Sequence, residues 1–519
     1  MSDAGERGQK AASAPPPFCL LPTRSAAAAG ERIEVRGADE TNSAREAPWP
    51  LTWGRGINTA VVGILGAVIL VHSRWGTQFS CTPEANQSCS SNVPPTFPIA
   101  NDVDVPRLPT VAFLNRCYWP DSEATGQLLA DLCIDLSQDF QVHVICGMPN
   151  SPTTDEYVHH GTETRDGVII HRLRHSSFEK KSKFGRLLNL TSFSWAARRY
   201  LRSTEHRFDL VVSETDPFLL PLVAAKYAKR TDAKLVCYLQ DIYPDVAEAI
   251  GKVKTSWLTR RLRRRLKSAY DQADRVVVLG DCMERRLIAS PWSIDPAKMR
   301  VLPNWSDCQS IQPIDGSKNP FRSRHGLGDK IVVMHSGNMG LTQRLDVLID
   351  ATRTAQWPDN AVLLLVGDGA VKEALVDQAG DSDRVRFLPY QPRESLGESL
   401  SAADLHVVSM HPNITGCLCP SKLYGILAAG RAVLAIADDR TDLAQTVSGH
   451  RLGWTCPPGQ AGAMAAAVAK AAGNREELAK AGRRAREIAL QRYDRPVVTK
   501  QFSAMLKELL PTDGTSAGS

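Results

Sequence analysis

The chain has 519 residues, more than a single domain needs at roughly 150 residues per domain. Hydrophobic residues make up 43% of it and charged residues 23%, which excludes a wholly disordered chain and a membrane protein with many spans. The 62 Lys and Arg against 56 Asp and Glu leave a net charge of +6, an excess that identifies no partner unless the basic residues cluster.

The first 106 residues differ in composition from the rest of the chain. Residues 1–50 and 76–106 are rich in Ala, Pro, Ser and Gly and lack helical or strand periodicity, so we expect a low-complexity, disordered extension over 1–106. Within it, 57–71 is an apolar run flanked by Trp and Arg. A helix of that length rises about 22 Å against a hydrocarbon core of about 30 Å, so a single-pass anchor at 57–71 stays an open alternative.

From residue 107 onward, short apolar runs alternate with amphipathic helical stretches, the pattern of parallel sheets covered by helices. The first series of predicted strands is 109–115, 141–147, 168–173, 209–213, 233–239, 274–279 and 298–302. The second series is 331–336, 361–366, 385–389, 405–409 and 432–437. We therefore predict an α/β fold of two Rossmann-like, doubly wound domains facing a central cleft, over 107–308 and 309–495, with a final helix and tail over 496–519.

An acidic residue follows one predicted strand of the first domain. The strand 233–239 ends in Gln240 and Asp241. Ligands of doubly wound sheets bind beyond the carboxyl ends of the strands. Asp241 is therefore a candidate for contacting a hydroxyl group or a positive charge.

Two amphipathic stretches of the first domain carry dense positive charge. Six of the eight residues from Arg260 to Lys267 are basic, while Leu258, Leu262, Leu266 and Tyr270 share one helical face. A second basic group adjoins apolar and aromatic residues, and it consists of Lys180, Lys181, Lys183 and Arg186. The two together favour an anionic membrane surface as a partner, with a solvated helix as the simpler alternative. Nucleic acid is not predicted, because no recognition motif accompanies the charge.

The first strand of the second series runs into a glycine-rich loop, Gly337 to Gly340, before a helix expected to begin near Thr342. Glycines let backbone amides approach an anion, and a helix start adds partial positive charge. We place Arg344 in the first turn of that helix, where its fork would suit a diphosphate. A strand-to-helix turn needs glycine for steric reasons as well, so the loop alone does not decide between the two.

The second strand of this series ends in Gly367, Asp368 and Gly369. This tight turn either passes close to a base or ribose or is only a turn. Farther along, Ser421 is a predicted N-cap and Lys422 opens a helix that runs to Gly430. Because a lysine raises the positive potential of a helix start instead of balancing it, an anionic ligand is the economical explanation of Lys422.

The 12 cysteines are scattered without a CxxC pair, which argues against a disulfide scaffold and favours a reducing cytosol. Only Cys417 and Cys419 lie close together, and they lack the further ligands of a metal site. We therefore predict no metal at this pair.

Taken together, the residues from about 109 to 510 resemble family 4 glycosyltransferases of the GT-B fold, in the branch that builds bacterial surface polysaccharides. The order and spacing of the motifs carry the resemblance, and these are YWP to ATG (Tyr118 to Gly126), ETDP (Glu214 to Pro217), QDIYPD (Gln240 to Asp245), VLPNW (Val301 to Trp305), HSGNMG (His335 to Gly340), LLVGDG (Leu364 to Gly369), FLPYQPRE (Phe387 to Glu394) and PSKLYGILAAGRAV (Pro420 to Val433).

The resemblance implies a retaining transfer of a sugar from a UDP- or GDP-linked donor to a saccharide or polyprenyl-linked acceptor, with no cofactor and no required metal. It implies a cytoplasmic protein, peripheral to the inner face of the cell membrane. By the same resemblance the catalytic residues are Asp241, Arg344 and Lys422. The donor-binding residues implied are Gly337, Asn338, Gly340, Gly367, Asp368, Gly369, Tyr390 and Ser421.

The chain departs from the family pattern at three positions. Gln240 stands where many relatives have His, and Cys417 and Gly425 stand where the family commonly has two glutamates. A non-catalytic paralogue acting as a partner subunit therefore stays an alternative, as does a nucleotide-sugar epimerase on the same fold. A dinucleotide-dependent oxidoreductase is disfavoured, because neither domain's first strand is followed by GxGxxG with a downstream acid.

Overall fold

The computed structural model describes residues 107–149, 158–176, 178 and 183–511. The extension over 1–106 and its apolar segment at 57–71 lie outside these residues, so disorder and the anchor both stay predictions. Within the described part of the chain, no helix combines the length and the apolar character needed to cross a membrane.

The first domain is built on an eight-stranded sheet in the order β3-β4-β2-β1-β5-β6-β7-β8. Its strands are β1 (Thr110–Leu114), β2 (Gln141–Cys146), β3 (Gly161–Arg165), β4 (Val168–Arg172), β5 (Leu210–Ser213), β6 (Lys234–Leu239), β7 (Arg275–Val278) and β8 (Met299–Val301). All neighbours pair in parallel except β3 and β4. The central strands are apolar runs buried on both faces, as parallel strands between helical layers must be.

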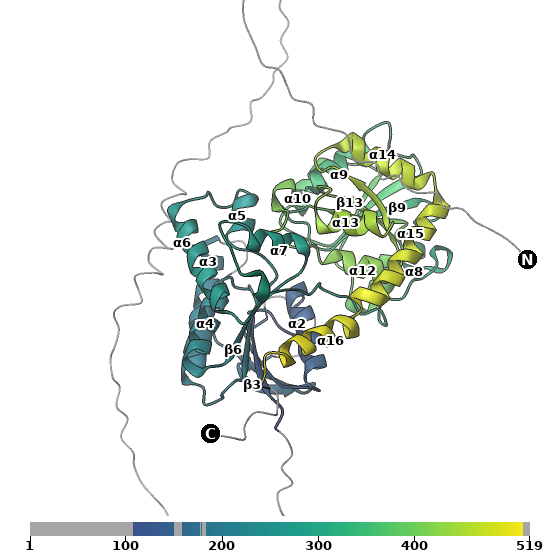
Figure 1. The fold of residues 1–519 in the computed structure, drawn as a ribbon. Coiled ribbons are helices and arrows are strands. Elements are labelled where there is room, and N and C mark those ends of the chain that lie inside the picture. Colours follow the sequence, from purple (N-terminus) through teal and green to yellow (C-terminus); the bar gives the residue numbers. More distant parts are fainter. Residues whose placement is uncertain (1–106, 150–157, 177, 179–182, 512–519) are drawn as a thin grey trace, which may run out of the picture. The chain divides into compact units, whose positions relative to one another are not determined.

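Helices cover both faces of this sheet (Figure 1). Those of the first domain are α2 (Ala124–Leu136), α3 (Lys183–Ser203), α4 (Leu220–Thr231), α5 (Asp245–Ala249), α6 (Trp257–Gln272) and α7 (Asp281–Ile288). Helix α4 contacts α3 and α6 as well as β5 and β6, so these three helices form one layer. The predicted apolar face of α6 is confirmed, because Leu258, Leu266 and Tyr270 are buried.

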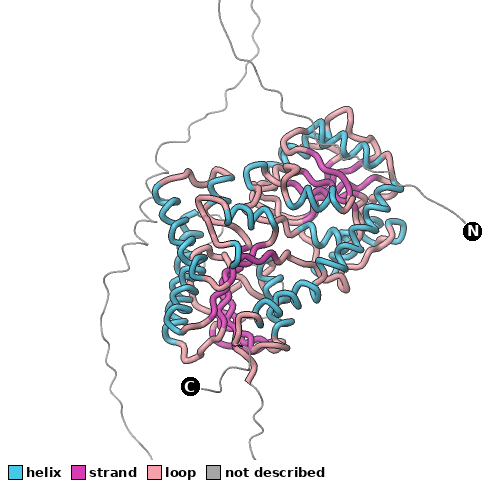
Figure 2. Tube along the Cα trace, in the orientation of Figure 1, coloured by secondary structure: helices cyan, strands magenta, loops and turns pink. Residues whose placement is uncertain are grey.

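The second domain has a six-stranded, wholly parallel sheet in the order β11-β10-β9-β12-β13-β14. In Figure 2 the strands of the two domains form two separate groups, each with helices around it. Its strands are β9 (Ile331–Ser336), β10 (Ala361–Val366), β11 (Val385–Leu388), β12 (Leu405–Ser409), β13 (Ala432–Ile436) and β14 (Gly453–Cys456). Its helices are α8 (Pro320–Arg324), α9 (Leu345–Thr352), α10 (Lys372–Ala379), α11 (Leu396–Ser401), α12 (Lys422–Ala428), α13 (Asp442–Gly449), α14 (Ala461–Ala472) and α15 (Arg475–Ile488).

A π-helical turn, Ala489–Tyr493, leads from α15 into the last helix, α16 (Arg495–Lys507). Helix α16 packs against the first domain, where Phe502 meets Phe113 and Tyr238 with ring centroids 6.3 and 5.2 Å apart. The last described helix therefore lies on the domain in which the described part of the chain begins.

Each sheet reverses its winding direction at one place. The chain winds outward from β1 through β2 to β4 and then outward on the other side from β5, so β1 and β5 flank the switch point of the first sheet. In the second sheet β9 and β12 flank the corresponding point. Doubly wound folds bind ligands just beyond the strand ends at such points, so the loops after these four strands are the places to examine.

Two strands were missed from the sequence, β3 and β14. The β3 sequence GTETR has no buried residue, because it is an edge strand paired only with β4. β14 reads GWTC and has a single buried residue. Neither carries the apolar run that identified the other strands.

Candidate functional site

At the switch point of the second domain, the loop after β9 lies directly against the loop after β12. The backbone amide of His411 donates a hydrogen bond to the carbonyl oxygen of Thr342 over 2.7 Å. The glycine-rich loop and the segment that leads to Lys422 are thus joined, although about seventy residues of sequence separate them.

The glycine-rich loop also packs tightly against the turn after β10. The amide of Met339 donates to the carbonyl of Asp368 over 2.8 Å. A Cβ added at Gly367 would collide with the carbonyl oxygen of Gly337, and Gly367 has φ +133°. Gly369, at φ +155°, would collide in the same way with Met339. Close loop packing by itself therefore requires these two glycines, whatever the turn binds.

Lys422 is a half-buried cation aimed at the glycine-rich loop. A Cβ built on Gly337 would lie 2.8 Å from Lys422 Cε, and the charge of Lys422 is one of the causes that lower the pKa of His335, after burial. Burial lowers the pKa of Lys422 itself to about 8. No carboxylate within ion-pair distance of this ammonium is found in the described residues, so the site keeps an unbalanced positive charge.

The structure corrects the expected setting of Arg344. Helix α9 begins at Leu345 and not near Thr342, and Arg344 precedes it as a left-handed residue with φ +49°. Its guanidinium forms a forked ion pair with Asp346, with Nη2 2.8 Å and Nε 3.0 Å from the carboxylate oxygens. To bind a diphosphate as predicted, the Arg344 guanidinium must therefore break its ion pair with Asp346.

The remaining predicted donor residues fall around these same loops. Ser421 occupies the predicted N-cap position of α12, but it is in helical conformation and its side chain makes no capping hydrogen bond. Asn338 lies against Gly369, and the Tyr390 hydroxyl donates to the carbonyl of Asp368 over 3.3 Å. Tyr390 is 55% exposed, so its ring is available to a ligand.

Asp241, from the first domain, reaches the second domain's loop. It forms an isolated backbone bridge with Leu418, and the amide of Ile242 donates to the carbonyl of Cys417 over 2.8 Å. Burial, and then the charge of Asp216, raise the pKa of Asp241 to about 6. An acid from the loop after β6 is thus held beside the segment that precedes Lys422.

A charged group at the first domain's own switch point was missed from the sequence. Arg116, after β1, lies with its Nη2 2.9 Å from Asp216 and 3.3 Å from Glu123. The thiol of Cys117 contacts the same two carboxylates at 3.1 Å. A signal was present in the sequence, because Arg116 and Asp216 lie two and three residues after the ends of β1 and β5, which are both predicted strands and are neighbours in the sheet.

The position usually occupied by His is part of a buried polar network. The Gln240 side-chain amide lies 3.5 Å from Glu214 Oε1, and its oxygen accepts from Asn304 over 3.4 Å. Burial, and then Asp216, raise the pKa of Glu214 well above its ordinary value. Gln240 thus supports the strand end and is itself only 7% exposed.

Cys417 and Gly425, at the two positions where the family commonly has glutamate, are both closely surrounded by neighbouring residues. Cys417 is fully buried, and its pKa is raised by burial to about 11. A Cβ at Gly425 would lie 3.3 Å from Leu400 Cδ1, so a larger side chain there would require Leu400 to move. The structure therefore accommodates the small residues that this sequence carries.

Two cavities of about 280 and 210 Å³ are found in the described part of the first domain, and neither is lined by a predicted donor residue. The larger is lined in part by Thr110, His143 and His206, and the smaller in part by Arg198, Lys226 and Arg230. Binding of a donor at the loops of the second domain accordingly stays a prediction.

Comparison with protein families gives two matches. Residues 124–305 match the model of the glycosyl transferase 4-like domain, and residues 317–488 match the model of glycosyl transferases group 1. Together the two matches take in more than half of the chain.

Curated relatives agree with these matches. The chain is 28% identical over 316 residues to the probable glycosyltransferase WbjE of Pseudomonas aeruginosa, covering 60% of this chain and 77% of the relative. It is 26% identical over 226 residues to the putative colanic acid biosynthesis glycosyl transferase WcaI of Escherichia coli, covering 42% and 54%. It is 30% identical over 228 residues to D-inositol 3-phosphate glycosyltransferase of Mycobacterium leprae, covering 40% and 51%. The chain thus spans about half the length of these last two relatives.

Solved structures share the fold. Sucrose-phosphate synthase from Thermosynechococcus elongatus superposes with a TM-score of 0.63 at 18% identity, covering 78% of this chain and 99% of that one. HepE of Anabaena, solved in complex with UDP and glucose, superposes with a TM-score of 0.58 at 17% identity, covering 77% and 99%. At these identities the likeness establishes two GT-B domains.

Proposed function

This chain belongs to the group 1 glycosyltransferases of the GT-B fold, and we propose that it transfers a sugar from a nucleotide-sugar donor, with retained configuration, to a saccharide or polyprenyl-linked acceptor. The observation that carries the proposal is the half-buried ammonium of Lys422, which lies against Gly337 without a carboxylate in the described residues. A cation held in low dielectric without a partner favours an anion at that position.

The donor diphosphate supplies such an anion. In the proposed complex it lies along the glycine-rich loop, with Lys422 on one side and Arg344 approaching after release from Asp346. Tyr390 and the turn from Gly367 to Gly369 lie next to the nucleotide. HepE, whose structures include complexes with UDP and with UDP-glucose, supports the choice of a UDP-sugar as the first donor to be tested.

The proposed chemistry is substitution at the anomeric carbon of the sugar. The bond between this carbon and the diphosphate oxygen breaks, the acceptor oxygen bonds to the carbon on the same face, and the acceptor proton passes to the departing diphosphate. Lys422 and Arg344 stabilise the charge that grows on the leaving group. Asp241 stabilises the positive charge that develops on the sugar. We propose no resident metal or cofactor for this reaction.

The donor proposal predicts selective stabilisation by one nucleotide sugar. A ligand at a hundred times its Kd stabilises the native state by about 2.7 kcal/mol, which raises the thermal midpoint by several degrees. We expect this shift with UDP-sugars in a screen of the full chain against UDP-, GDP- and ADP-sugars. The donor that binds is then incubated with acceptor lipids, and proton NMR of the first product identifies its anomeric configuration.

Each part of this screen can fail separately. If only GDP-sugars raise the thermal midpoint, the donor nucleotide is GDP and not UDP, and the proposed binding site is retained. Donor turnover without any acceptor points to an epimerase, and no shift with any nucleotide sugar points to a non-catalytic partner subunit. An inverted product contradicts the retaining mechanism.

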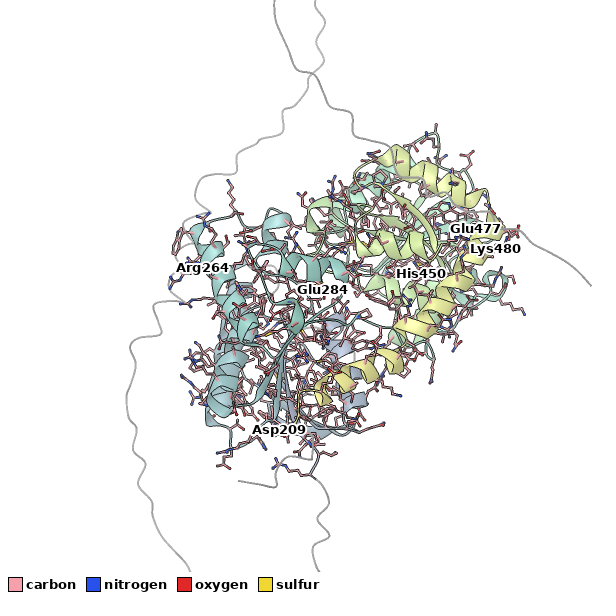
Figure 3. The ribbon with its side chains drawn as sticks, in the orientation of Figure 1. Asp209, Arg264, Glu284, His450, Glu477 and Lys480 are labelled. Atoms are coloured by element: carbon pink, nitrogen blue, oxygen red, sulfur yellow. The ribbon has the colours of Figure 1, made fainter. Side chains whose placement is uncertain are left out.

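We further propose that the acceptor is presented at an anionic membrane surface and that the polymer belongs to surface polysaccharide biosynthesis, as the name of WcaI, a putative colanic acid biosynthesis glycosyl transferase, suggests for that protein. The layer of α3, α4 and α6 supports a membrane contact. It exposes Trp195 and Trp257, at 59% and 57%. Arg264 (Figure 3) and Arg265 on α6 are also exposed. Within the described residues, no carboxylate lies in ion-pair distance of either.

Not all of the basic run is available for this purpose. Arg263 is paired with Asp245 and Glu248 at 2.8 Å, and Lys267 with Asp271 at 2.8 Å, so both are used inside the domain. In the second predicted basic group, the side chains of Lys180, Lys181, Lys183 and Arg186 lie outside the described residues, and their part in membrane binding stays a prediction.

Reversing the two exposed charges tests the membrane contact. Each basic residue near an anionic surface is worth about 1 kcal/mol, so we expect the double variant Arg264→Glu, Arg265→Glu to bind phosphatidylglycerol-containing vesicles at least about 30-fold more weakly. Flotation of the full chain measures binding. The matched control, Arg483→Glu with Arg492→Glu, makes the same charge change on the second domain. Equal loss in both pairs contradicts a specific contact.

A further inference from the structure

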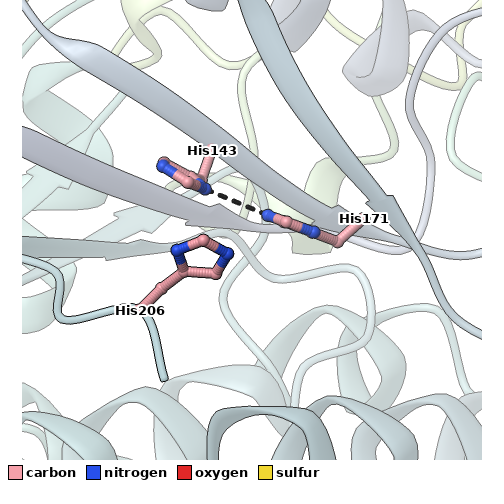
Figure 4. A group of neighbouring side chains, drawn as sticks. All are labelled: His143, His171 and His206. Atoms are coloured by element: carbon pink, nitrogen blue, oxygen red, sulfur yellow. Dashed lines mark hydrogen bonds between the residues drawn. The ribbon is translucent and has the colours of Figure 1, made fainter. Parts of the chain in front are cut away.

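Three histidines from three separate segments of the first domain meet at one place outside the proposed donor site. His143 lies in β2, His171 in β4, and His206 in the connection between α3 and β5. One ring nitrogen from each lies within 4.8 Å of the other two. Figure 4 shows His206 facing the hydrogen-bonded pair of His143 and His171.

The spacing of the nitrogens is close to that of a metal-binding triad. His143 Nδ1 and His171 Nε2 are 3.0 Å apart. Zn²⁺ binds imidazole nitrogens at about 2.0–2.1 Å in tetrahedral geometry, which places two ligand nitrogens about 3.3 Å apart. The two rings therefore need to move only slightly apart for both nitrogens to bind the same ion. His206 is exposed, so its ring can make the larger adjustment.

Neighbouring side chains fix the orientation of His171. Its Nδ1 lies 2.9 Å from Thr162 Oγ1, which leaves Nε2 facing His143. Metal-binding histidines are held in this way by a hydrogen bond at the other nitrogen. Tyr200 packs on the His171 ring and Phe208 on the His143 ring, at centroid distances of 5.0 and 5.1 Å.

We propose that His143, His171 and His206 form a binding site for Zn²⁺ or a similar late first-row divalent cation, with three imidazole ligands and a fourth position open to solvent. Imidazole is a preferred ligand of these metals. The fourth position faces the cavity of about 280 Å³ that His143 and His206 help to line. Arg107, Glu205 and Arg207 line the same cavity, so water or a small anion beside these charged groups completes the shell.

The site lies apart from the proposed chemistry. Thr110 and Gln141, the first residues of β1 and β2, line the same cavity, so it opens at the amino ends of the strands. The donor residues follow the carboxyl ends of strands in the second domain. The ion would clamp the α3–β5 connection onto β2 and β4, and its effect is on stability and not on transfer.

A second group in the described residues has metal-ligand chemistry, Cys117 with Glu123 and Asp216. There the guanidinium of Arg116 already lies 2.9 Å from Asp216 and 3.3 Å from Glu123. This group therefore already holds one internal cation between its two carboxylates, and it provides a distinguishable alternative outcome for a metal titration.

Cobalt titration of the full chain tests the proposal. After treatment with EDTA and dialysis, we expect one equivalent of Co²⁺ to bind per chain with the visible d–d bands of a nitrogen-rich tetrahedral site and without a thiolate-to-cobalt charge-transfer band. Zn²⁺ should displace it and raise the thermal midpoint. His206→Ala is expected to weaken binding at least about a hundredfold, and Thr162→Val about tenfold or more. The control His450→Gln, in the second domain, should bind as wild type.

His206 is exposed and outside the proposed catalytic residues, so its alanine variant should fold and keep wild-type transfer activity. No Co²⁺ binding at millimolar concentration would overturn the proposal and leave a hydrogen-bonded histidine pair. Binding that survives His206→Ala would overturn it as well. A thiolate charge-transfer band lost in Cys117→Ser would assign the metal to the other group.

Discussion

Replacing Lys422 with alanine is expected to lower kcat about a hundredfold, the usual cost of removing one preorganised group that stabilises developing charge. The ammonium lies against Gly337 with no carboxylate in the described residues, so the variant loses a cation that the fold holds for the leaving diphosphate. Steady-state transfer with the donor identified by thermal shift measures the effect. Lys422→Arg keeps the charge and should retain a larger share of the rate.

The pH dependence of the wild type provides a second test of Lys422. Burial lowers its pKa to about 8, so kcat/KM should fall above about pH 8 as the ammonium loses its proton. A folded-state pKa below the unfolded value means that the unfolded chain binds more protons between the two values, so stability rises with pH there. Titration of Lys422 therefore does not itself destabilise the fold over this range, and the thermal midpoint measured at each pH separates loss of rate from unfolding.

Lys470→Ala, an exposed lysine of the same domain, is the control for this prediction. It should leave both the rate and the alkaline limb unchanged. Wild-type turnover in purified, folded Lys422→Ala would contradict the donor site.

Asp241→Asn is expected to lower kcat/KM by about a hundredfold or more, within the range for groups that act on the reacting centre. The residue belongs to the first domain, but its backbone is bridged to Leu418 of the second, beside the segment that leads to Lys422. An amide keeps the shape of the carboxylate and loses its charge. Kinetics with the identified donor, together with the thermal midpoint, separate catalysis from folding.

The pKa of Asp241 predicts that Asp241→Asn lowers activity without lowering stability. Burial, and then Asp216, raise the pKa of Asp241 to about 6, so its contribution to stability is present at low pH and is lost as pH rises from the unfolded value to about 6. At pH 7 the fold holds an unfavourable carboxylate, and asparagine should keep or raise the midpoint. The wild-type rate should fall below about pH 6, and this acid limb should be absent in the variant.

Asp232→Asn is the matched control, an exposed acid at φ +61° where asparagine is also tolerated. It should leave rate and pH profile unchanged. If Asp241→Asn loses activity because it no longer folds, Asp241 has a structural role, and this contradicts the proposal that it acts on the reacting sugar.

The sequence by itself determined the fold. Apolar β-branched runs separated by amphipathic helices predict two parallel sheets, and the structure confirms twelve predicted strands within a residue or two. These strands can be identified in the sequence because a parallel strand is buried on both faces and is therefore apolar throughout. The edge strands β3 and β14 carry no such requirement, and both were missed. The positions of the glycine-rich loop after a strand and of Lys422 at a helix start were also predicted, because the signals for strand ends and helix starts are local, whereas their role in binding an anion stays a prediction.

Only the tertiary structure decided which of these residues meet. The switch point between β9 and β12 brings Lys422 to Gly337, and an inter-domain contact brings Asp241 to Leu418. Arg344 lies before α9 and is paired with Asp346, which no spacing rule predicts. His143, His171 and His206 show no motif because they come from three segments that adjoin only in the folded sheet. Local sequence determines how each segment folds, whereas contacts between distant segments depend on how the chain winds through both sheets.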